Sequence, residues 1–167
     1  MSNIGERLYM NILLVNGSLT IGGNTAIMAH EFKEAMQKEN HKVSVFNLVE
    51  GCDELTNWIN RMERVDMLVF ASPIYWGGMT GLLKSFIDRF NPNSTFYKNI
   101  KYGTALVNSE YKRDSEFILN HFKLIFRYLE MEYIDALLIT DMKSKGDMNN
   151  KLHEVNDYVN ELLYKIE

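Results

Sequence analysis

The sequence predicts an α/β protein built on one doubly wound sheet of five parallel strands, in the order 2-1-3-4-5, with helices on both faces. The first observation is that apolar, strand-like runs alternate with amphipathic, helix-like runs along the whole chain. This alternation is typical of βαβ units. The second is that five strands joined by right-handed crossovers favour this order, which places a ligand outside the carboxyl ends of the first and third strands.

The five predicted strands are short apolar segments. The first contains the uninterrupted run Ile12-Leu13-Leu14-Val15, as expected of a parallel strand buried on both faces. The second alternates apolar and polar residues, so we expect it nearer an edge of the sheet. In chain order, the strands are expected at residues 9–16, 42–48, 65–71, 102–107 and 133–140.

Helical periodicity fills the segments between the strands. The helix after the third strand, for example, carries Leu82, Leu83, Phe86 and Phe90 at helical spacing. The five helices are expected at residues 25–39, 52–64, 80–90, 115–130 and 147–165. No repeat or interdomain linker interrupts this layout, so we expect one flavodoxin-like domain over residues 1–167.

Composition limits the class of protein. The formal net charge of −4 argues against nucleic acid or an anionic membrane surface as the main partner. No apolar run is long enough to cross a bilayer, and the first eight residues lack the apolar core of a signal peptide. Cys52 is the only cysteine, and the four histidines lack metal-ligand spacing. We therefore expect a cytoplasmic protein without a metal site.

The loop after the first strand has the composition of a phosphate-binding loop. It offers the hydroxyls of Ser18, Thr20 and Thr25 and the side chain of Asn24, but neither lysine nor arginine. Loop amides and a helix amino terminus can hold a phosphate without a cation. Gly22 and Gly23 allow close backbone approach and positive φ. Taken alone, an ordinary turn with Asn24 or Thr25 as helix N-cap explains this loop equally well.

Other nucleotide motifs fit this loop less well. A Walker-A loop requires a Gly-Lys-Ser/Thr ending, which is absent. The dinucleotide fingerprint fails in register, because the glycines after Gly17 are Gly22 and Gly23. There are no acidic residues at the ends of strands one and three to form a phosphoacceptor site. The pattern indicates a phosphate attached to a flat molecule.

The loop after the third strand supplies the flat surface. Pro73 restricts its backbone, Gly77 and Gly78 leave amides accessible, and Tyr75 or Trp76 offers an aromatic wall for a ring, with Trp76 favoured. Packing against neighbouring loops or a second subunit is the alternative for these aromatics. Both loops follow the strands that flank the expected switch point, so together they indicate a phosphorylated flavin.

The loop after the fourth strand adds a third candidate contact at the same edge. Asn108 and Ser109 begin it, where they contact the ligand or form a plain polar turn. No side chain is nominated as a catalytic acid or base, since the flavin supplies the redox chemistry. The candidate cofactor-binding residues are Ser18, Thr20, Gly23, Asn24, Thr25, Pro73, Ile74, Tyr75, Trp76, Gly77, Gly78, Asn108 and Ser109.

These motifs resemble those of the NADPH-dependent FMN reductase family, especially the branch related to iron–sulfur flavoproteins. The resemblance lies in Gly-Ser-x-x-x-Gly-Gly-Asn-Thr at residues 17–25, Ser-Pro-Ile-Tyr-Trp-Gly-Gly-Met at 72–79 and Leu-Lys-Ser-Phe-Ile-Asp-Arg at 83–89. It implies non-covalent FMN, with its phosphate at Ser18, Asn24 and Thr25 and its ring against residues 73–78. It also implies a homodimer or homotetramer with the flavin near the subunit interface.

Three departures from the family pattern matter. Leu19 and Thr20 stand where relatives often have Pro and Arg, so the phosphate contacts are expected to rely more on backbone. The cysteine cluster of the iron–sulfur relatives is missing, with only Cys52 in that region. The loop after the fourth strand, often glycine-rich in relatives, is Asn-Ser-Glu-Tyr here. No iron–sulfur cluster is therefore expected, and the motifs do not identify the pocket for the electron acceptor.

The leading hypothesis is an FMN-dependent NAD(P)H oxidoreductase that passes electrons to a small acceptor: a quinone, a flavin, an azo compound or a metal ion. The first alternative is a flavodoxin-like electron carrier with little NAD(P)H oxidation of its own. A second is an interaction protein of the same fold that has lost its cofactor. Phe96 and Tyr97 are open to three roles: loop packing, a dimer contact or a lid over the flavin.

Overall fold

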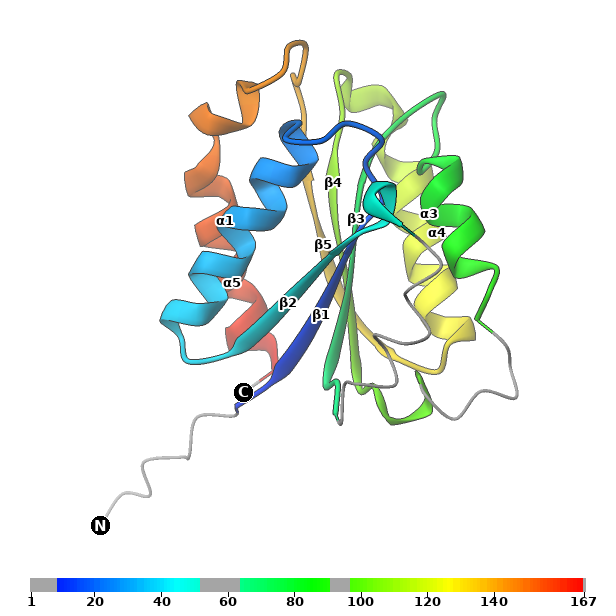
Figure 1. Cartoon of the computed structure of the whole chain (residues 1–167), viewed down its shortest axis with the longest axis vertical. Helices are drawn as coiled ribbons and strands as arrows, with labels where there is room; N and C mark the ends of the chain where they lie inside the picture. The colour runs from blue at the N-terminus through cyan, green and yellow to red at the C-terminus, as the bar shows by residue number, and fades with distance from the viewer. Residues whose placement is uncertain (1–8, 52–63, 91–96, 167) are drawn as a thin grey trace.

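The computed structural model describes residues 9–51, 64–90 and 97–166. They form one sheet of parallel strands in the order β2-β1-β3-β4-β5 (Figure 1). The order and the parallel pairing are those predicted, and the second strand lies at an edge as expected. The strands are β1 (Asn11–Asn16), β2 (Lys42–Asn47), β3 (Met67–Pro73), β4 (Tyr102–Asn108) and β5 (Glu132–Ile139).

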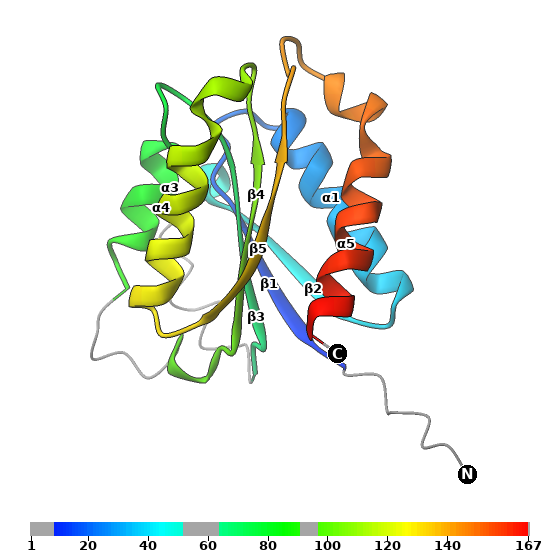
Figure 2. The ribbon, with the colours of Figure 1, turned by 180° about the vertical axis from the view of Figure 1, so that it is seen from behind.

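The helices cover both faces of the sheet. Helices α1 (Asn24–Lys38) and α5 (Leu152–Ile166) lie on one face, and α3 (Gly81–Ile87) and α4 (Ser115–Tyr128) lie on the other (Figures 1 and 2). The helix predicted over residues 52–64 falls, except for Arg64, outside the described residues. Short 3-10 turns stand at Leu48–Glu50, Tyr97–Asn99, Lys112–Asp114 and Asp147–Asn150.

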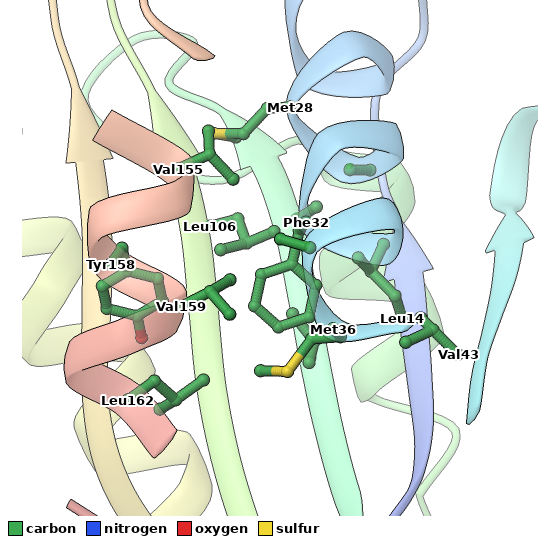
Figure 3. Packing of buried hydrophobic residues seen from close by; sticks show 14 of the residues in the cluster. Leu14, Met28, Phe32, Met36, Val43, Leu106, Val155, Tyr158, Val159 and Leu162 are labelled. Atoms are coloured by element: carbon green, nitrogen blue, oxygen red, sulfur yellow. The ribbon is translucent and has the colours of Figure 1, made fainter. Parts of the chain in front are cut away.

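Two apolar cores follow from the alternation of side chains along the buried strands. On β1, Leu14 faces the layer of α1 and α5, where Phe32 lies at the centre of the packing (Figure 3). The neighbouring Leu13 belongs to the core beneath α3 and α4, with Phe70 of β3. Phe70 packs against four other rings there: Phe86, Phe90, Phe122 and Phe126.

Tyr97 belongs to this second core. Its side chain is buried, and its ring lies 5.6 Å from that of Phe90. The residue precedes β4, so it stands at the amino edge of the sheet, opposite the predicted ligand site. Of the three roles left open for Tyr97, the structure therefore supports loop packing. Phe96 lies outside the described residues.

Two helix boundaries differ from the prediction by three residues or more. Helix α3 ends at Ile87 rather than at residue 90, because the chain tightens there into turns in which Arg89 and Phe90 donate to carbonyls three residues back. Helix α5 begins at Leu152 rather than at residue 147, because the preceding residues form the 3-10 turn Asp147–Asn150. That turn is held by hydrogen bonds from outside the segment, which apolar periodicity does not register.

Candidate functional site

One cavity opens at the carboxyl edge of the sheet, where four strand-to-helix loops meet. Its volume is about 270 Å³, close to the lower end of the ~300–1,000 Å³ that small-molecule sites span. The loops that form it follow β1, β3, β4 and β5 and lie at the upper end of the sheet in Figure 1. The lining residues are Ser18, Thr20, Gly23, Asn24, Thr25, Pro73, Ile74, Tyr75, Asn108, Ser109, Glu110, Met142, Lys143, Ser144 and Lys145.

Hydrogen bonds continue from the sheet into these loops and hold them side by side. Gly17 N–H donates to the carbonyl of Ala71 over 2.8 Å, which joins the loop after β1 to β3. Ile74 N–H donates to Asn108 O, and Ser109 N–H donates to Ile139 O, each over 2.9 Å. The site is therefore a continuous edge of four strands, and its loops are positioned by the same backbone pairing that forms the sheet.

Local side-chain bonds shape the loop after β1. The Asn16 carboxamide oxygen accepts from Ser18 N–H over 3.0 Å, and Ser18 Oγ accepts from Thr20 N–H over 3.1 Å. These are the short turns that Asn and Ser side chains form with backbone two residues on. Gly22 then takes a φ of 63°, a left-handed conformation that glycine adopts without strain. The chain reverses over a few residues and delivers the start of α1 to the cavity.

The amino terminus of α1 has no side-chain cap. Gly23 is the N-cap residue, so neither Asn24 nor Thr25 plays the capping role of an ordinary turn. The first hydrogen bond of the helix runs from Ile27 N–H to Gly23 O over 3.0 Å. Within the residues the structure describes, the amides of Asn24, Thr25 and Ala26 have no backbone acceptor. These unpaired amides and the positive end of the helix dipole make the helix start a candidate anion site, and Asn24 and Thr25 line the cavity there.

Thr25 and Asn108 connect this helix start to β4. Both side chains are buried, and the Thr25 hydroxyl donates to Asn108 Oδ1 over 2.6 Å. The hydroxyl proton of Thr25 is therefore used within the protein. Thr25 can instead donate to an anion through its backbone amide. The sequence prediction placed Thr25 and Asn108 in the site through separate loops; the structure brings them into direct contact.

Asn24 does not offer its side chain to the cavity as a free donor, which corrects one element of the sequence prediction. Its Oδ1 accepts from Gly146 N–H over 2.9 Å and from Met148 N–H over 3.2 Å. Its Nδ2 donates to Ser144 O over 2.8 Å. The side chain thereby ties the loop after β5 to the start of α1. A ligand can meet Asn24 through its backbone amide.

Thr80 ties the loop after β3 to the loop after β1. Its hydroxyl donates to Gly17 O over 2.6 Å and accepts from Leu83 N–H over 3.1 Å, which caps α3. Its own amide donates to Ser72 Oγ over 3.1 Å. Gly17 permits this close approach, because a Cβ atom there would lie 2.5 Å from Cβ of Leu83. The relative position of the two predicted ligand loops is thus set by Thr80.

Residues 75–78 form a tight reverse turn. Tyr75 N–H and Gly78 O pair over 2.9 Å, and Gly78 N–H and Tyr75 O over 3.1 Å. Trp76 and Gly77 between them both have positive φ, 53° and 76°, as in a type I′ turn. A left-handed tryptophan is uncommon and costs of the order of 1–3 kcal/mol. Gly78 N–H is therefore paired inside the turn, whereas the prediction left both glycine amides accessible.

The two aromatics of this turn are placed differently. Tyr75 lines the cavity and is about half exposed, whereas Trp76 stands at the tip of the turn with its side chain fully exposed. Trp76, Gly77 and Gly78 are the predicted site residues that do not line the cavity of this chain. The favoured assignment of Trp76 as the aromatic wall therefore changes: within this chain, Tyr75 has the position for it.

Sequence reasoning missed the loop after β5. Met142, Lys143, Ser144 and Lys145 line the cavity, as does Glu110 from the loop after β4. The loop is anchored by Met142 N–H, which donates to Ser109 O over 3.0 Å. Its position was available from the topology, since β5 also ends at this edge. Its contribution is chemical as well as spatial, because the two lysines bring positive charge to the site.

Two other classes of site are not found within the described ranges. Histidine, cysteine and carboxylate side chains do not gather there in a group that could hold a metal ion. None of the described helices has the length and apolar character needed to span a bilayer. Cys52 lies outside these ranges.

Comparison with known proteins adds family and fold. The sequence profile of the family described as NADPH-dependent FMN reductase matches residues 10–145. YwqN of Bacillus subtilis, provisionally named as an NAD(P)H-dependent FMN-containing oxidoreductase, is 33% identical over 97 residues, covering 49% of this chain and 52% of that protein. The iron–sulfur flavoprotein MJ1083 of Methanocaldococcus jannaschii is 24% identical over 102 residues, covering 50% and 53%. Each match thus spans about half of the relative's length.

Solved structures agree with the fold. The Trp repressor binding protein of Bacillus subtilis superposes with a TM-score of 0.73 at 24% identity, covering 90% of this chain and 99% of that one. An NAD(P)H:quinone oxidoreductase of Methanothermobacter marburgensis gives 0.74 at 13% identity, covering 93% and 96%. At these identities the likeness is one of fold, and it supports the flavodoxin-like topology predicted from sequence.

Proposed function

Because the chain belongs to the NADPH-dependent FMN reductase family, we propose that it binds FMN, accepts electrons from NADH or NADPH, and passes them to a small acceptor. Quinones, flavins, azo compounds and metal ions are the acceptor classes of this proposal. When bound, FMN supplies the redox chemistry, and the protein supplies binding, orientation and hydrogen bonds. The cavity must therefore suit both ends of FMN, its phosphate and its ring.

The phosphate end suits the start of α1. The amides of Asn24, Thr25 and Ala26 have no backbone acceptor in the described part of the chain, and the first two residues line the cavity. A phosphate monoester carries close to two negative charges at neutral pH, and a helix amino terminus is a favourable place for it. Gly23 adds no side chain that would fill this space. These groups would hold the phosphate.

The ring end suits the loop after β3. Pro73, Ile74 and Tyr75 form one wall of the same cavity, with Asn108 and Ser109 beside them. Tyr75 would lie against the ring, and polar groups of residues 108–109 would meet the pyrimidine side. This chain's part in the reaction is then to orient the ring and shield one side of it. No side chain need transfer a proton.

The single observation that carries the proposal is the arrangement of these two ends in one cavity. The uncapped start of α1 and the Pro73–Tyr75 wall belong to loops after β1 and β3, and both line the same space. In sheets of this order, that edge is the switch point where ligands bind. A phosphate site and a flat wall at a switch point together suit a phosphorylated planar ring, and the family match identifies that ring as FMN.

We propose that residues 1–167 act as one FMN-binding domain, in the cytoplasm, as a homodimer or homotetramer. Trp76 supports an assembly, since a fully exposed tryptophan on a strained turn beside the cavity is placed to meet a second subunit or a substrate. Trp76, Gly77 and Gly78 then belong to the site through that assembly.

The experiment is the visible absorption spectrum of the purified protein, before and after anaerobic addition of NADH and of NADPH. The proposal predicts a flavin spectrum that bleaches within seconds with at least one nucleotide. A flavin spectrum that persists with both would replace the enzyme by an electron carrier, which should instead be reduced by a partner reductase. A colourless protein that does not take up added FMN would refute both.

A further inference from the structure

The loop after β1, which forms the proposed phosphate site, has no cationic side chain to balance the charge of a phosphate. Residues 17–25 contain no lysine or arginine, so the ligand's two negative charges would meet only neutral hydrogen-bond donors there. Two ammonium groups line the cavity, Lys143 and Lys145, and both come from the loop after β5. They are 118 or more positions away from the phosphate loop in the sequence (143 − 25 = 118), so only the fold brings them to it.

Lys145 lies on the phosphate loop itself. Its Nζ donates to the carbonyl of Ile21 over 3.3 Å. The same Nζ would be 3.9 Å from a Cβ atom built on Gly22, at the left-handed turn. One of its three N–H donors is used by Ile21, which leaves two for an anion. The ammonium therefore stands at the rim of the loop, beside the helix start.

The backbone on both sides of Lys145 is fixed by Asn24. Ser144, before it, gives its carbonyl to Asn24 Nδ2, and Gly146, after it, gives its amide to Asn24 Oδ1. Ser144 N–H is also held by the Asp147 carboxylate over 2.7 Å. A residue of the phosphate loop thus clamps the chain at the two neighbours of Lys145. The clamp limits where this long side chain can place its charge.

Among the described residues, Lys145 has no acidic side chain as an ion-pair partner. Glu110 lines the same cavity, and Asp147 is engaged by Ser144 N–H. Within the described part of the chain, this exposed ammonium has a carbonyl partner but no carboxylate partner, so it is suited to a ligand that brings the negative charge.

We propose that Lys145 is the residue that selects the phosphorylated flavin, by placing its ammonium beside the FMN phosphate. The loop after β5 would then supply the cation for the phosphate, because the loop after β1 contains no lysine or arginine. This inference rests on the proposed function, since it assumes that FMN occupies the cavity. Because Lys145 is exposed and screened by salt, its effect is expected to be about tenfold in affinity rather than absolute.

The test compares FMN with riboflavin, which differs only by the phosphate. Dissociation constants for both are measured by flavin fluorescence or calorimetry on the apoprotein, for the wild type and for Lys145→Met, Lys145→Arg and Lys143→Met. Lys42→Met serves as the control for net charge, because Lys42 is exposed and begins β2 at the opposite edge of the sheet. Riboflavin affinity reports on the fold of the cavity independently of the phosphate.

The expected result is that Lys145→Met weakens FMN binding about tenfold and leaves riboflavin binding within twofold. Its FMN affinity should also become less dependent on salt. Lys145→Arg should recover most of the loss, and Lys42→Met should match the wild type.

Three outcomes would overturn the inference while the proposed function stands. In the first, Lys145→Met weakens FMN and riboflavin equally. In the second, Lys143→Met carries the loss of FMN selectivity in place of Lys145→Met. In the third, Lys145→Met leaves FMN affinity unchanged and, in rates of NADPH and NADH oxidation, changes only the preference between the two, which would assign the ammonium to the 2′-phosphate of NADPH. A wild-type protein that binds no FMN would instead refute the proposed function, and the inference with it.

Discussion

The Thr25 hydroxyl donates to the Asn108 carboxamide oxygen over 2.6 Å, and this buried contact joins the amino terminus of α1 to the carboxyl end of β4. The contact sets the distance between the proposed phosphate and ring ends of the site. It also uses two side chains that sequence reasoning had assigned directly to the ligand. We expect this hydrogen bond between the two side chains to position the backbone of both loops at the site.

Replacing Thr25 by Val should therefore lower stability and flavin affinity together. The change removes the donor but keeps the shape, leaving the buried Asn108 oxygen without its partner, at a cost of about 1–3 kcal/mol. Urea unfolding and FMN titration of the same variant are the measurements. Thr25→Ser keeps the hydroxyl and should lose less than half as much; equal losses for Ser and Val would show that the methyl group, not the hydrogen bond, matters.

Asn24 should be needed for the loop after β5 rather than for direct contact with the flavin. Asn24→Ala removes three hydrogen bonds to residues 144, 146 and 148, so amide hydrogen exchange in that loop should speed up by tenfold or more. Asn24→Asp keeps the two acceptor bonds but adds a negative charge at the phosphate site. It should therefore weaken FMN more than riboflavin, a preference that Asn24→Ala should show less strongly.

Gly17 should tolerate no side chain. A Cβ atom there would lie 2.5 Å from Leu83 Cβ, so Gly17→Ala should destabilise the protein by about 1–3 kcal/mol through overpacking. Gly81→Ala is the matched control, because an added Cβ there meets nothing within 4 Å and alanine favours the first turn of α3. Urea denaturation of both variants checks this. If Gly17→Ala were as stable as the wild type, the close approach of the two loops would be wrong.

The two aromatics of the turn at residues 75–78 should separate in their effects. Tyr75→Ala should weaken FMN affinity severalfold even when the protein is not assembled, because Tyr75 lines the cavity within one chain. Trp76→Gly should relieve the strain of the left-handed backbone at this position. The free energy of unfolding should therefore be unchanged or slightly higher. Any loss of flavin affinity or turnover in Trp76→Gly should appear only under conditions where the protein is assembled. Sedimentation and FMN titration across protein concentration test this.

Stability should decline in alkaline solution through the partly buried Tyr133 and the buried Tyr158. Burial, and then the nearby Asp135 charge, raises the pKa of Tyr133 from 10.0 to about 12, and burial raises the pKa of Tyr158 as well. The unfolded chain therefore loses these protons first, and the free energy of unfolding should fall between about pH 10 and 12. Tyr133→Phe should flatten that decline in urea unfolding curves measured at each pH. An unchanged decline would assign it to other groups.

The sheet and its ligand edge followed from the sequence because their causes are local. Continuous apolar runs such as residues 12–15 mark strands buried on both faces, and right-handed crossovers leave few orders for five of them. Once the order is known, the loops after the first and third strands must meet, and their glycine, hydroxyl and aromatic content names the ligand class. The family resemblance rested on those two loops and on the motif at residues 83–89, and the family match agrees with it.

The tertiary structure decided which groups of each loop face the cavity. Whether Asn24 serves a ligand or the loop after β5 depends on contacts with residues more than 100 positions away, which no local pattern records. The choice between Tyr75 and Trp76 depends on a reverse turn that gives neighbouring side chains different surroundings. The position of Lys145 depends on where β5 ends. Sequence periodicity reports burial and element type, whereas hydrogen bonds between distant segments aim individual side chains, and only folding brings those segments together.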